Sequence, residues 1–226
     1  MDLSMPKSCL ADRLWDLAVQ PGAVEEIHRN LGEACHEARN QLNILGVGLH
    51  LARQSDSGDR FDALTGAYRR LERLVEQFHA FCRPVRTMAI TVPFGMVIAG
   101  RIDDWTKLFR DNGRRLEIVL PIGPGLTTID PMQITSALDA FVSWRASASE
   151  GRGPAYCRWF ADCGRMHLKW DEPGTSWIGG ELDTGSLSEA MLARITANLG
   201  GESSLQRHPA YRVELRWPSG SEIPPG

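Results

Sequence analysis

The segment Cys35-His36-Glu37-Ala38-Arg39-Asn40-Gln41-Leu42-Asn43 lies inside a long run in which apolar and small residues recur every three or four positions. This spacing places them on one face of an α-helix. A second run with the same spacing follows the turn and capping residues Ser55-Asp56-Ser57-Gly58-Asp59, and Pro84 ends it. The sequence therefore predicts two long amphipathic helices joined by a short turn, a helical hairpin. The two stripes consist of Val24, Ile27, Leu31, Ala34, Ala38, Leu42, Leu45, Leu49 and Ala52, and of Phe61, Leu64, Ala67, Leu71, Leu74, Phe78 and Phe81.

A hairpin of this kind cannot bury both sides of its stripes by itself. Pairing with a second copy into a four-helix bundle would bury them through coiled-coil-like packing. We therefore expect a homodimer. The alternative is that the hairpin packs against the rest of its own chain.

The pattern changes to a mixture of helices and strands at about Met88, and the expected fold class is α+β. In the second half, three helices are expected to cover one face of a mixed sheet, as an α/β sandwich. The expected division is an N-terminal segment over residues 1–20, the hairpin over 21–86, the sandwich over 87–218 and a disordered tail over 219–226. The sequence leaves open whether residues 1–20 dock, cap the bundle or are disordered. The expected elements are helices at Pro93–Asn112, at Pro131–Ser149 after the cap Asp130, and at Ser186–Leu199, and strands at Leu116–Leu120, Leu126–Ile129, Ala155–Ala161, Met166–Trp170, Glu202–Arg207 and Tyr211–Trp217.

Composition and charge narrow the class of protein. Of the 226 residues, 42% are hydrophobic and 23% are charged, as in an ordinary soluble protein with a core. The formal net charge of -3 gives no reason to expect nucleic-acid binding. No apolar stretch reaches the length of about 18 residues that a membrane-spanning helix needs. The five cysteines are scattered without metal-ligand spacing, so we expect reduced thiols in a cytoplasmic protein and no metal site.

The residues from His36 to Asn43 follow the pattern His-Glu-x-Arg-Asn-x-Leu-Asn, which resembles the phosphoacceptor box of two-component histidine kinases. The position of the pattern, midway along a long helix that a second helix follows, agrees with this resemblance. The helical repeat turns His36 about 200° away from the core positions Ala34 and Ala38, so its imidazole is expected to face solvent. An exposed imidazole has a pKa near ~6.5, and its neutral form can attack a phosphoryl phosphorus.

The neighbours of His36 have side chains that suit phosphoryl transfer. Glu37 could hold or accept the ring proton and so fix the tautomer. Asn40, one turn on, shares a face with His36 and could orient an attacking water. In the kinases that the box resembles, this position is implicated in phosphatase activity. Arg39 could steady a phosphoryl oxygen or lie in solvent.

One residue of the box departs from the kinase pattern. Gln41 stands where a proline is usual, so the proline kink is absent. Gly46 and Gly48 could supply the bend or a close approach of the two helices instead.

The second half, from about Met88 to Pro218, resembles the ATP-binding lobe of histidine kinases in the order of its elements. That lobe contains a helix with the motif Asn-Leu-Leu-x-Asn-Ala, whose second asparagine binds Mg²⁺. The counterpart is Asp139–Trp144, and the metal-binding asparagine falls on Ser143. A serine hydroxyl is a poor ligand for a cation that prefers carboxylate or amide oxygens.

Two glycine motifs of the same lobe are also eroded. Asp171 matches the adenine-binding aspartate of Asp-x-Gly-x-Gly and Gly174 remains beside it, but Pro173 replaces a glycine and removes an amide donor. Of the glycine-rich phosphate loop only Gly185 is left, near Asp183, whose charge would repel phosphate. We therefore expect no ATP binding and no cofactor in this chain.

These resemblances imply a histidine phosphotransferase that shuttles a phosphoryl group between receiver-domain aspartates of response regulators, with Mg²⁺ bound by the receiver. Three alternatives stay open: a non-catalytic dimeric adaptor, a histidine kinase with a divergent ATP site, and a phosphatase that depends on Asn40.

Overall fold

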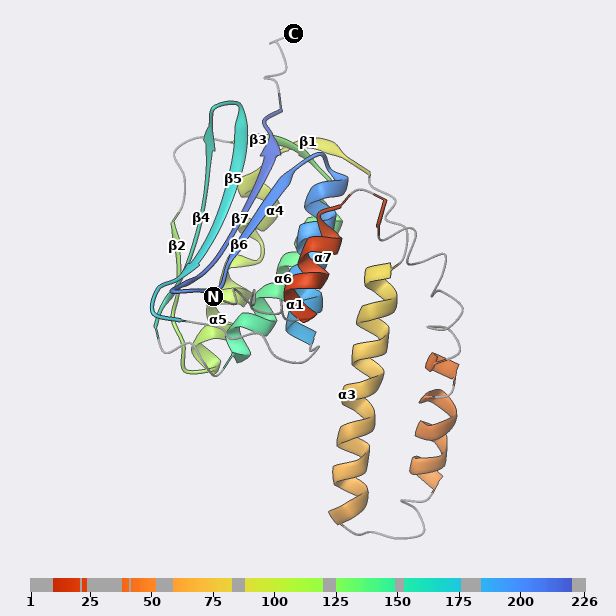
Figure 1. Cartoon of the computed structure of the whole chain (residues 1–226). Helices are drawn as coiled ribbons and strands as arrows, with labels where there is room; N and C mark the ends of the chain where they lie inside the picture. Colours follow the sequence, from red (N-terminus) through yellow and green to blue (C-terminus); the bar gives the residue numbers. More distant parts are fainter. Residues whose placement is uncertain are drawn as a thin grey trace, which may run out of the picture. The chain divides into compact units, whose positions relative to one another are not determined.

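The computed structural model describes residues 10–20, 22–23, 38–40, 42–51, 59–82, 88–119, 125–148, 153–175 and 184–220. They belong to two compact units. The lobe comprises Met1–Pro21 and Val85–Gly226, and the helical unit comprises Gly22–Pro84. Figure 1 draws both units, coloured along the chain.

The helical unit contains two antiparallel helical segments. Residues 38–40 and 42–51 are helical, and α3 covers Asp59–Cys82, as the second apolar stripe predicts. Leu42 and Phe81 are buried. The predicted helical residues 24–37 and the predicted turn lie outside the described part of the chain, as does the tail beyond residue 220.

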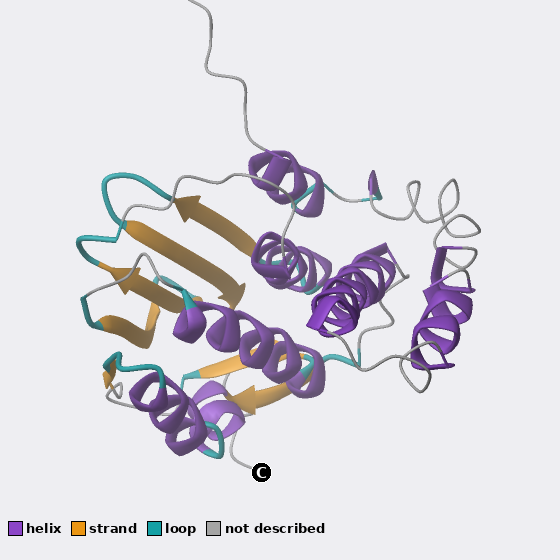
Figure 2. Ribbon diagram, turned by 90° about the horizontal axis from the view of Figure 1, so that it is seen from below, coloured by secondary structure: helices purple, strands orange, loops and turns teal. Residues whose placement is uncertain are grey.

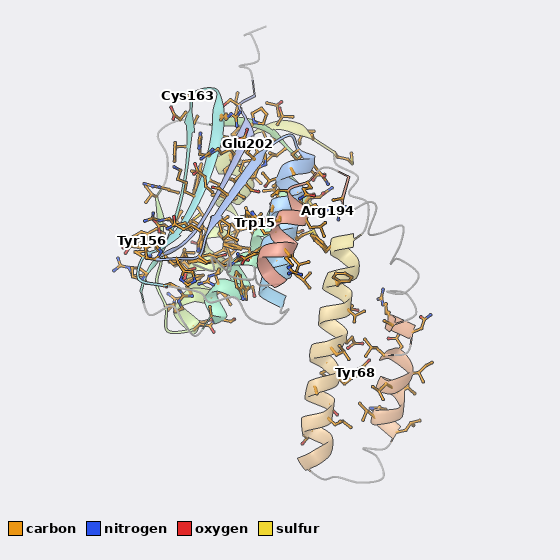
Figure 3. All side chains as sticks on the ribbon, viewed as in Figure 1. Trp15, Tyr68, Tyr156, Cys163, Arg194 and Glu202 are labelled. Atoms are coloured by element: carbon orange, nitrogen blue, oxygen red, sulfur yellow. The ribbon has the colours of Figure 1, made fainter. Side chains whose placement is uncertain are left out.

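Gly46 lets the two helical segments approach closely. A Cβ atom on Gly46 would lie 2.6 Å from Cζ of Tyr68, whereas a Cβ atom on Gly48 would meet nothing within 4 Å. The hydroxyl of Tyr68 donates a hydrogen bond of 2.9 Å to Oε1 of Glu72 on α3. Figure 3 shows Tyr68 between the two segments. Of the two roles that the sequence allows for these glycines, close approach is therefore confirmed for Gly46.

Gly46→Ala is expected to be about 1–3 kcal/mol less stable than Gly48→Ala, because the added methyl group meets the ring end of Tyr68 and forces it to move. Gly48→Ala is the matched control, since it adds the same group in open space and gains about 1 kcal/mol of helix propensity. Urea denaturation measures both variants. Equal stabilities would show that Tyr68 moves aside at no cost.

The strands of the lobe are β1 (Ile90–Pro93), β2 (Leu116–Val119), β3 (Leu126–Ile129), β4 (Ala155–Asp162), β5 (Arg165–Glu172), β6 (Glu202–Gln206) and β7 (Tyr211–Pro218). The main sheet has the order β2-β4-β5-β7-β6, in which β2 and β4 are parallel and the other neighbours antiparallel. β1 and β3 pair separately as an antiparallel ribbon. Side chains alternate along β4, β5 and β7, so one face of the sheet is buried and apolar and the other carries charged residues.

The helices of the lobe are α1 (Leu10–Ala18), α4 (Phe94–Ala99), α5 (Ile102–Asp111), α6 (Pro131–Ser147) and α7 (Thr184–Asn198). Of these, α5, α6 and α7 lie on the apolar face of the sheet (Figure 2). Trp105, Phe141 and Leu192, one from each helix, line the same core against β5 and β7. This is the three-helix layer on a mixed sheet that the sequence predicts. No helix within the described residues is both long and apolar enough to cross a membrane.

Capping residues fix the ends of two lobe helices where the sequence places them. Oδ1 of Asp130 accepts hydrogen bonds of 3.1 Å from the backbone N–H groups of Met132 and Gln133 at the start of α6. Gly200 follows α7 with a φ of 71°, a left-handed conformation that glycine adopts without strain. The predicted hairpins β4-β5 and β6-β7 are also confirmed.

The single helix predicted over Pro93–Asn112 is wrong. Pro93 is the last residue of β1, and Gly100 and Arg101 separate α4 from α5. Glycine costs a helix interior about 1 kcal/mol relative to alanine, so the chain turns at Gly100.

Residues 10–20 pack on the lobe. Leu14, Trp15 and Ala18 of α1 are buried, and α1 lies against α7. Figure 3 labels Trp15. Asp12 forms an ion pair with Arg207, which follows β6. Of the possibilities that the sequence leaves open for residues 1–20, docking on the lobe is therefore the one observed for residues 10–20.

Candidate functional site

His36 and Glu37 lie outside the described residues, but the helix immediately after them is described. Arg39 and Asn40 are both exposed on it. Nη2 of Arg39 lies 3.5 Å from Oε1 of Glu76 on α3, and the two side chains are 45% and 48% exposed. An exposed ion pair contributes about 0.2–1 kcal/mol. Arg39 can therefore leave Glu76 for another anion at little cost.

Asn40 begins an exposed apolar stripe. Ile44, Val47 and Leu51 follow it at helical spacing, so the four side chains share one side of the helix. The three aliphatic side chains are 66%, 62% and 57% exposed. We call these four residues the outer face. A contiguous apolar patch of this kind marks an interaction surface.

A second exposed apolar surface comprises Leu45, Leu64 and Leu71, which are 52%, 52% and 47% exposed. We call it the side face. Leu45 lies about 100° round its helix from Ile44, and Leu64 and Leu71 lie two turns apart on one side of α3. All three belong to the stripes from which the sequence predicts a buried core.

The residues predicted as remnants of a nucleotide site are scattered over the lobe. Ser143 is exposed on α6. Gly174 has a φ of 77° in the turn after β5, and Gly185 lies in the first turn of α7. Asp171 is on the charged face of the sheet, where Arg212 lies 3.0 Å from its carboxylate. Its side chain therefore points away from the helices.

Glu172, the next residue, points toward the helices and is fully buried. Arg145 of α6 donates two hydrogen bonds to its carboxylate, from Nε at 2.7 Å and from Nη2 at 2.8 Å. Nη2 of Arg114 and Nε1 of Trp170 donate two more, each at 2.7 Å. Four N–H donors compensate the buried charge of this carboxylate.

Sequence reasoning missed Arg145 and Glu172, although one signal was present. The apolar residues of Met166–Trp170 alternate along β5, and extending that alternation puts position 172 on the buried face and position 171 on the exposed face. Arg145 follows Phe141 by one helical turn, which places it on the buried side of α6.

The guanidinium group of Arg145 is also stacked between aromatic rings. Its carbon lies 4.1 Å from the ring centre of Tyr211 and 4.6 Å from that of Trp144. Burial acts to lower the pKa of Arg145, but Glu172 outweighs burial and raises it. Burial acts to raise the pKa of Glu172, but its hydrogen bonds, first that of Arg145, hold it below the ordinary value. Both groups are charged at neutral pH.

The lowered pKa makes the contribution of Glu172 to stability depend on pH. This contribution is complete above the unfolded-state pKa of about 4.3 and is lost as the pH falls through the lower folded-state pKa. The difference in unfolding free energy between the wild type and Glu172→Gln is expected to stay constant from about pH 7 to pH 5 and to shrink below about pH 4. Urea denaturation over this range measures it. A difference that grows on acidification would mean that burial dominates.

A second buried carboxylate, Glu189 of α7, lies in a separate cluster. It accepts hydrogen bonds from Oη of Tyr211 at 2.5 Å and from Nη2 of Arg207 at 2.6 Å. Burial raises the pKa of Glu189 despite these partners. Because Arg207 also pairs with Asp12 of α1, the cluster joins α1, α7 and β7, and we assign it a structural role.

Within the described part of the lobe, the residues that match the kinase nucleotide motifs are poorly suited to hold a nucleotide with Mg²⁺. Glu172, the buried carboxylate next to the predicted adenine-binding Asp171, already binds Arg145 and Arg114. Ser143 offers a hydroxyl where the cation prefers an amide or carboxylate oxygen. Within the described ranges, no three His, Cys, Asp or Glu side chains gather as a metal site requires.

Comparison with known proteins shows a likeness in structure and none in sequence. No family model matches the chain, and no curated protein matches it. The crystal structure of full-length ShkA in complex with AMPPNP is similar, with a TM-score of 0.59 and 14% identity over 85% of this chain and 46% of ShkA. The histidine kinase AdeS of Acinetobacter baumannii has a TM-score of 0.53 and 14% identity over 80% of this chain and 97% of the AdeS chain. The chain thus spans less than half of the length of ShkA, and what these similarities establish is a histidine-kinase-like fold.

Proposed function

We propose that this protein is a histidine phosphotransferase of a two-component phosphorelay, which passes a phosphoryl group between receiver-domain aspartates through His36 in the bacterial cytoplasm. One observation supports the proposal: in a lobe of histidine-kinase-like fold, the carboxylate of Glu172, next to the predicted adenine-binding Asp171, is buried and already accepts four N–H donors, which disfavours ATP as the source of phosphate. A protein of this fold that takes no phosphate from ATP must receive it from another protein. Receiver domains carry phosphate on an aspartate and hold their own Mg²⁺, which makes them the fitting donors and acceptors.

The transfer step exchanges one reactive phosphoryl linkage for another. A neutral ring nitrogen of His36 attacks the phosphorus of the aspartyl phosphate, the P–N bond forms, and the P–O bond to the aspartate breaks. The aspartate carboxylate leaves onto the Mg²⁺ of the receiver. Glu37 holds the proton on the other ring nitrogen, and Arg39 steadies a phosphoryl oxygen. The reverse step phosphorylates a second receiver, and Asn40 orients water in the slower loss of phosphate.

The side face supports a homodimer. Leu45, Leu64 and Leu71 are apolar side chains that both helical segments leave about half exposed. Burying an aliphatic side chain stabilises by about 1.5–3 kcal/mol. A second copy that brings the same leucines would complete a four-helix bundle with both sets inside.

The outer face supports the docking of a receiver. Ile44, Val47 and Leu51 remain exposed on the side of the helix opposite to Gly46, where α3 packs. A bundle formed through the side face would leave them free. They follow Asn40 by four to eleven residues on the same side of the helix, so a receiver seated on them would bring its aspartate to the predicted phosphoacceptor box.

A glutamate substitution is expected to impair receiver binding on the outer face and dimerisation on the side face. Ile44→Glu should weaken receiver binding by about 30-fold, the effect of losing a central apolar contact, and leave the dimer intact. Leu64→Glu should dissociate the dimer, because it buries an unpaired carboxylate in the bundle. Light scattering measures dimerisation, and a titration measures receiver binding. Both measurements are made on both variants, so each variant is the control for the other. Dissociation of the Ile44→Glu variant would assign the outer face to the dimer instead.

Phosphate relay between two receivers tests the function. A donor receiver phosphorylated with radiolabelled phosphate is mixed with an unphosphorylated acceptor receiver, with and without this protein. We expect label on the acceptor only when the protein is present. Loss of label from the donor with release of free phosphate would indicate a phosphatase, and label that stays on the donor would indicate an adaptor.

A further inference from the structure

No described helix covers the face of the main sheet that points away from α5, α6 and α7 (Figure 2). The side chains on this face form rows that cross the strands, because residues paired in register point to the same side of a sheet. Two neighbouring rows line a groove of about 500 Å³. One row contains Arg158 of β4, Lys169 of β5, Glu214 of β7 and Ser204 of β6, and the next contains Asp171, Arg212 and Gln206 of β5, β7 and β6.

Two positive charges stand directly opposite each other in this groove. Arg158 is the register partner of Lys169. The Cβ atoms of such a pair lie about 4.5–5.5 Å apart, and like charges at this separation repel. Nζ of Lys169 lies 3.2 Å from Oε1 of Glu214, whereas Arg158 is exposed and forms no ion pair with the described residues. An anionic group that bridges Arg158 and Lys169 would neutralise the charge that the groove leaves uncompensated.

The two carboxylates of the groove already have cationic partners. Nη2 of Arg216 lies 2.9 Å from Oε2 of Glu214. The hydrogen bonds that Glu214 accepts, first that of Arg216, lower its pKa to about 2. Nε of Arg212 lies 3.0 Å from Oδ1 of Asp171. Neither carboxylate is therefore available to neutralise Arg158.

The other features of the groove suit a peptide better than a densely charged polymer. Ser204 and Gln206 offer a hydroxyl and an amide, each of which can donate and accept hydrogen bonds. Three spacings of ~4.8 Å separate β4 from β6, so an extended segment of about four residues spans the groove. A chain of phosphates would bring negative charge to Asp171 and Glu214 as well, and like charges repel. A peptide can bring backbone N–H groups to these carboxylates instead.

We infer that this groove binds an acidic segment of a protein partner, with one carboxylate of the segment held between Arg158 and Lys169. Ser204 and Gln206 bind the backbone of the segment at the β6 end. The site belongs to the lobe alone and does not depend on phosphotransfer at His36.

Fluorescence anisotropy of the full-length protein with a fluorescein-labelled peptide of alternating glutamate and serine residues tests the inference. The ionic strength is kept at about 50 mM, because salt screens exposed charges. Arg158→Glu is expected to weaken binding about 10- to 100-fold, the effect of losing a charge-assisted contact. Lys107→Glu is the matched control, since it makes the same change of charge at an exposed position of α5 and should leave binding unchanged. A peptide with glutamine in place of glutamate should not bind.

Thermal unfolding shows whether a loss of binding reflects a loss of structure. Arg158→Glu should not lower the melting temperature, because a glutamate opposite Lys169 replaces repulsion by attraction. Arg158→Gln, which only removes the charge, should fold like the wild type and weaken binding less than Arg158→Glu.

Three results would overturn the inference. The first is equal binding by Arg158→Glu and Lys107→Glu, because the peptide would then respond to overall charge. The second is no binding by the wild type at a protein concentration of about 1 mM, which corresponds to no useful affinity. The third is a thymidine oligonucleotide that binds more tightly than the peptide and is lost in Arg158→Glu, which would assign the groove to nucleic acid.

Discussion

Glu172→Ala is expected to lower the unfolding free energy of the protein by about 3–5 kcal/mol, because it leaves buried guanidinium groups without their carboxylate. Arg145 is fully buried and Arg114 is 6% exposed, so water cannot solvate either one in place of Glu172. Trp170 also loses the acceptor of its indole N–H. Urea denaturation followed by tryptophan fluorescence measures the loss.

Asp171→Ala is the matched control for this prediction. It removes a carboxylate from the adjacent position of the same strand, where the partner Arg212 is 53% exposed. Its cost is expected to be below about 1 kcal/mol. Equal losses in the two variants would mean that Glu172 does not hold the lobe together as its four hydrogen bonds indicate.

His36→Gln is expected to reduce phosphoryl transfer between receivers to the uncatalysed background, because the amide that replaces the imidazole is no nucleophile. Receiver binding should be unchanged, since the apolar contacts of Ile44 and Val47 remain. The relay assay and a binding titration on the same preparations separate the two effects. His50→Gln, in the described helical segment that follows the box, serves as the control and should retain transfer.

The outcome for His36→Gln distinguishes the proposed function from its competitors. If His36→Gln binds receivers and still regulates them without transfer, the protein acts as an adaptor. A variant that still removes phosphate from the donor, and loses this activity when Asn40 is also replaced by alanine, would be a phosphatase. Full transfer by His36→Gln would contradict the role assigned to the box.

The sequence predicts most elements of the lobe because their local signals agree with the tertiary structure. Asp130 before Pro131, the alternation along β4 and β5, and the glycine after α7 each act through neighbouring residues. The prediction of one helix over Pro93–Asn112 fails because the apolar periodicity continues across Gly100, although a glycine disfavours a helix interior there.

The candidate site was harder to predict because it depends on contacts distant in sequence. Nothing local to Arg145 shows that its charge is matched by Glu172, 27 residues later. Matching the motif Asp-x-Gly-x-Gly by residue identity assigned the adenine-binding carboxylate to Asp171, because Asp171 is itself an aspartate. Strand alternation places Glu172, and not Asp171, on the face of β5 that points toward the core. The exposed leucines of the helical unit were predicted as core, which is the pattern expected of a surface that a second chain covers.

The most direct test of the proposed function follows the source of the phosphate on His36. The purified protein is incubated in parallel with a radiolabelled phosphoreceiver and with labelled ATP, and the modified residue is mapped by mass spectrometry at neutral pH. The proposal predicts acid-labile phosphohistidine at His36 from the receiver and none from ATP. Label on His36 from ATP would contradict it and identify the protein as a kinase with a divergent nucleotide site.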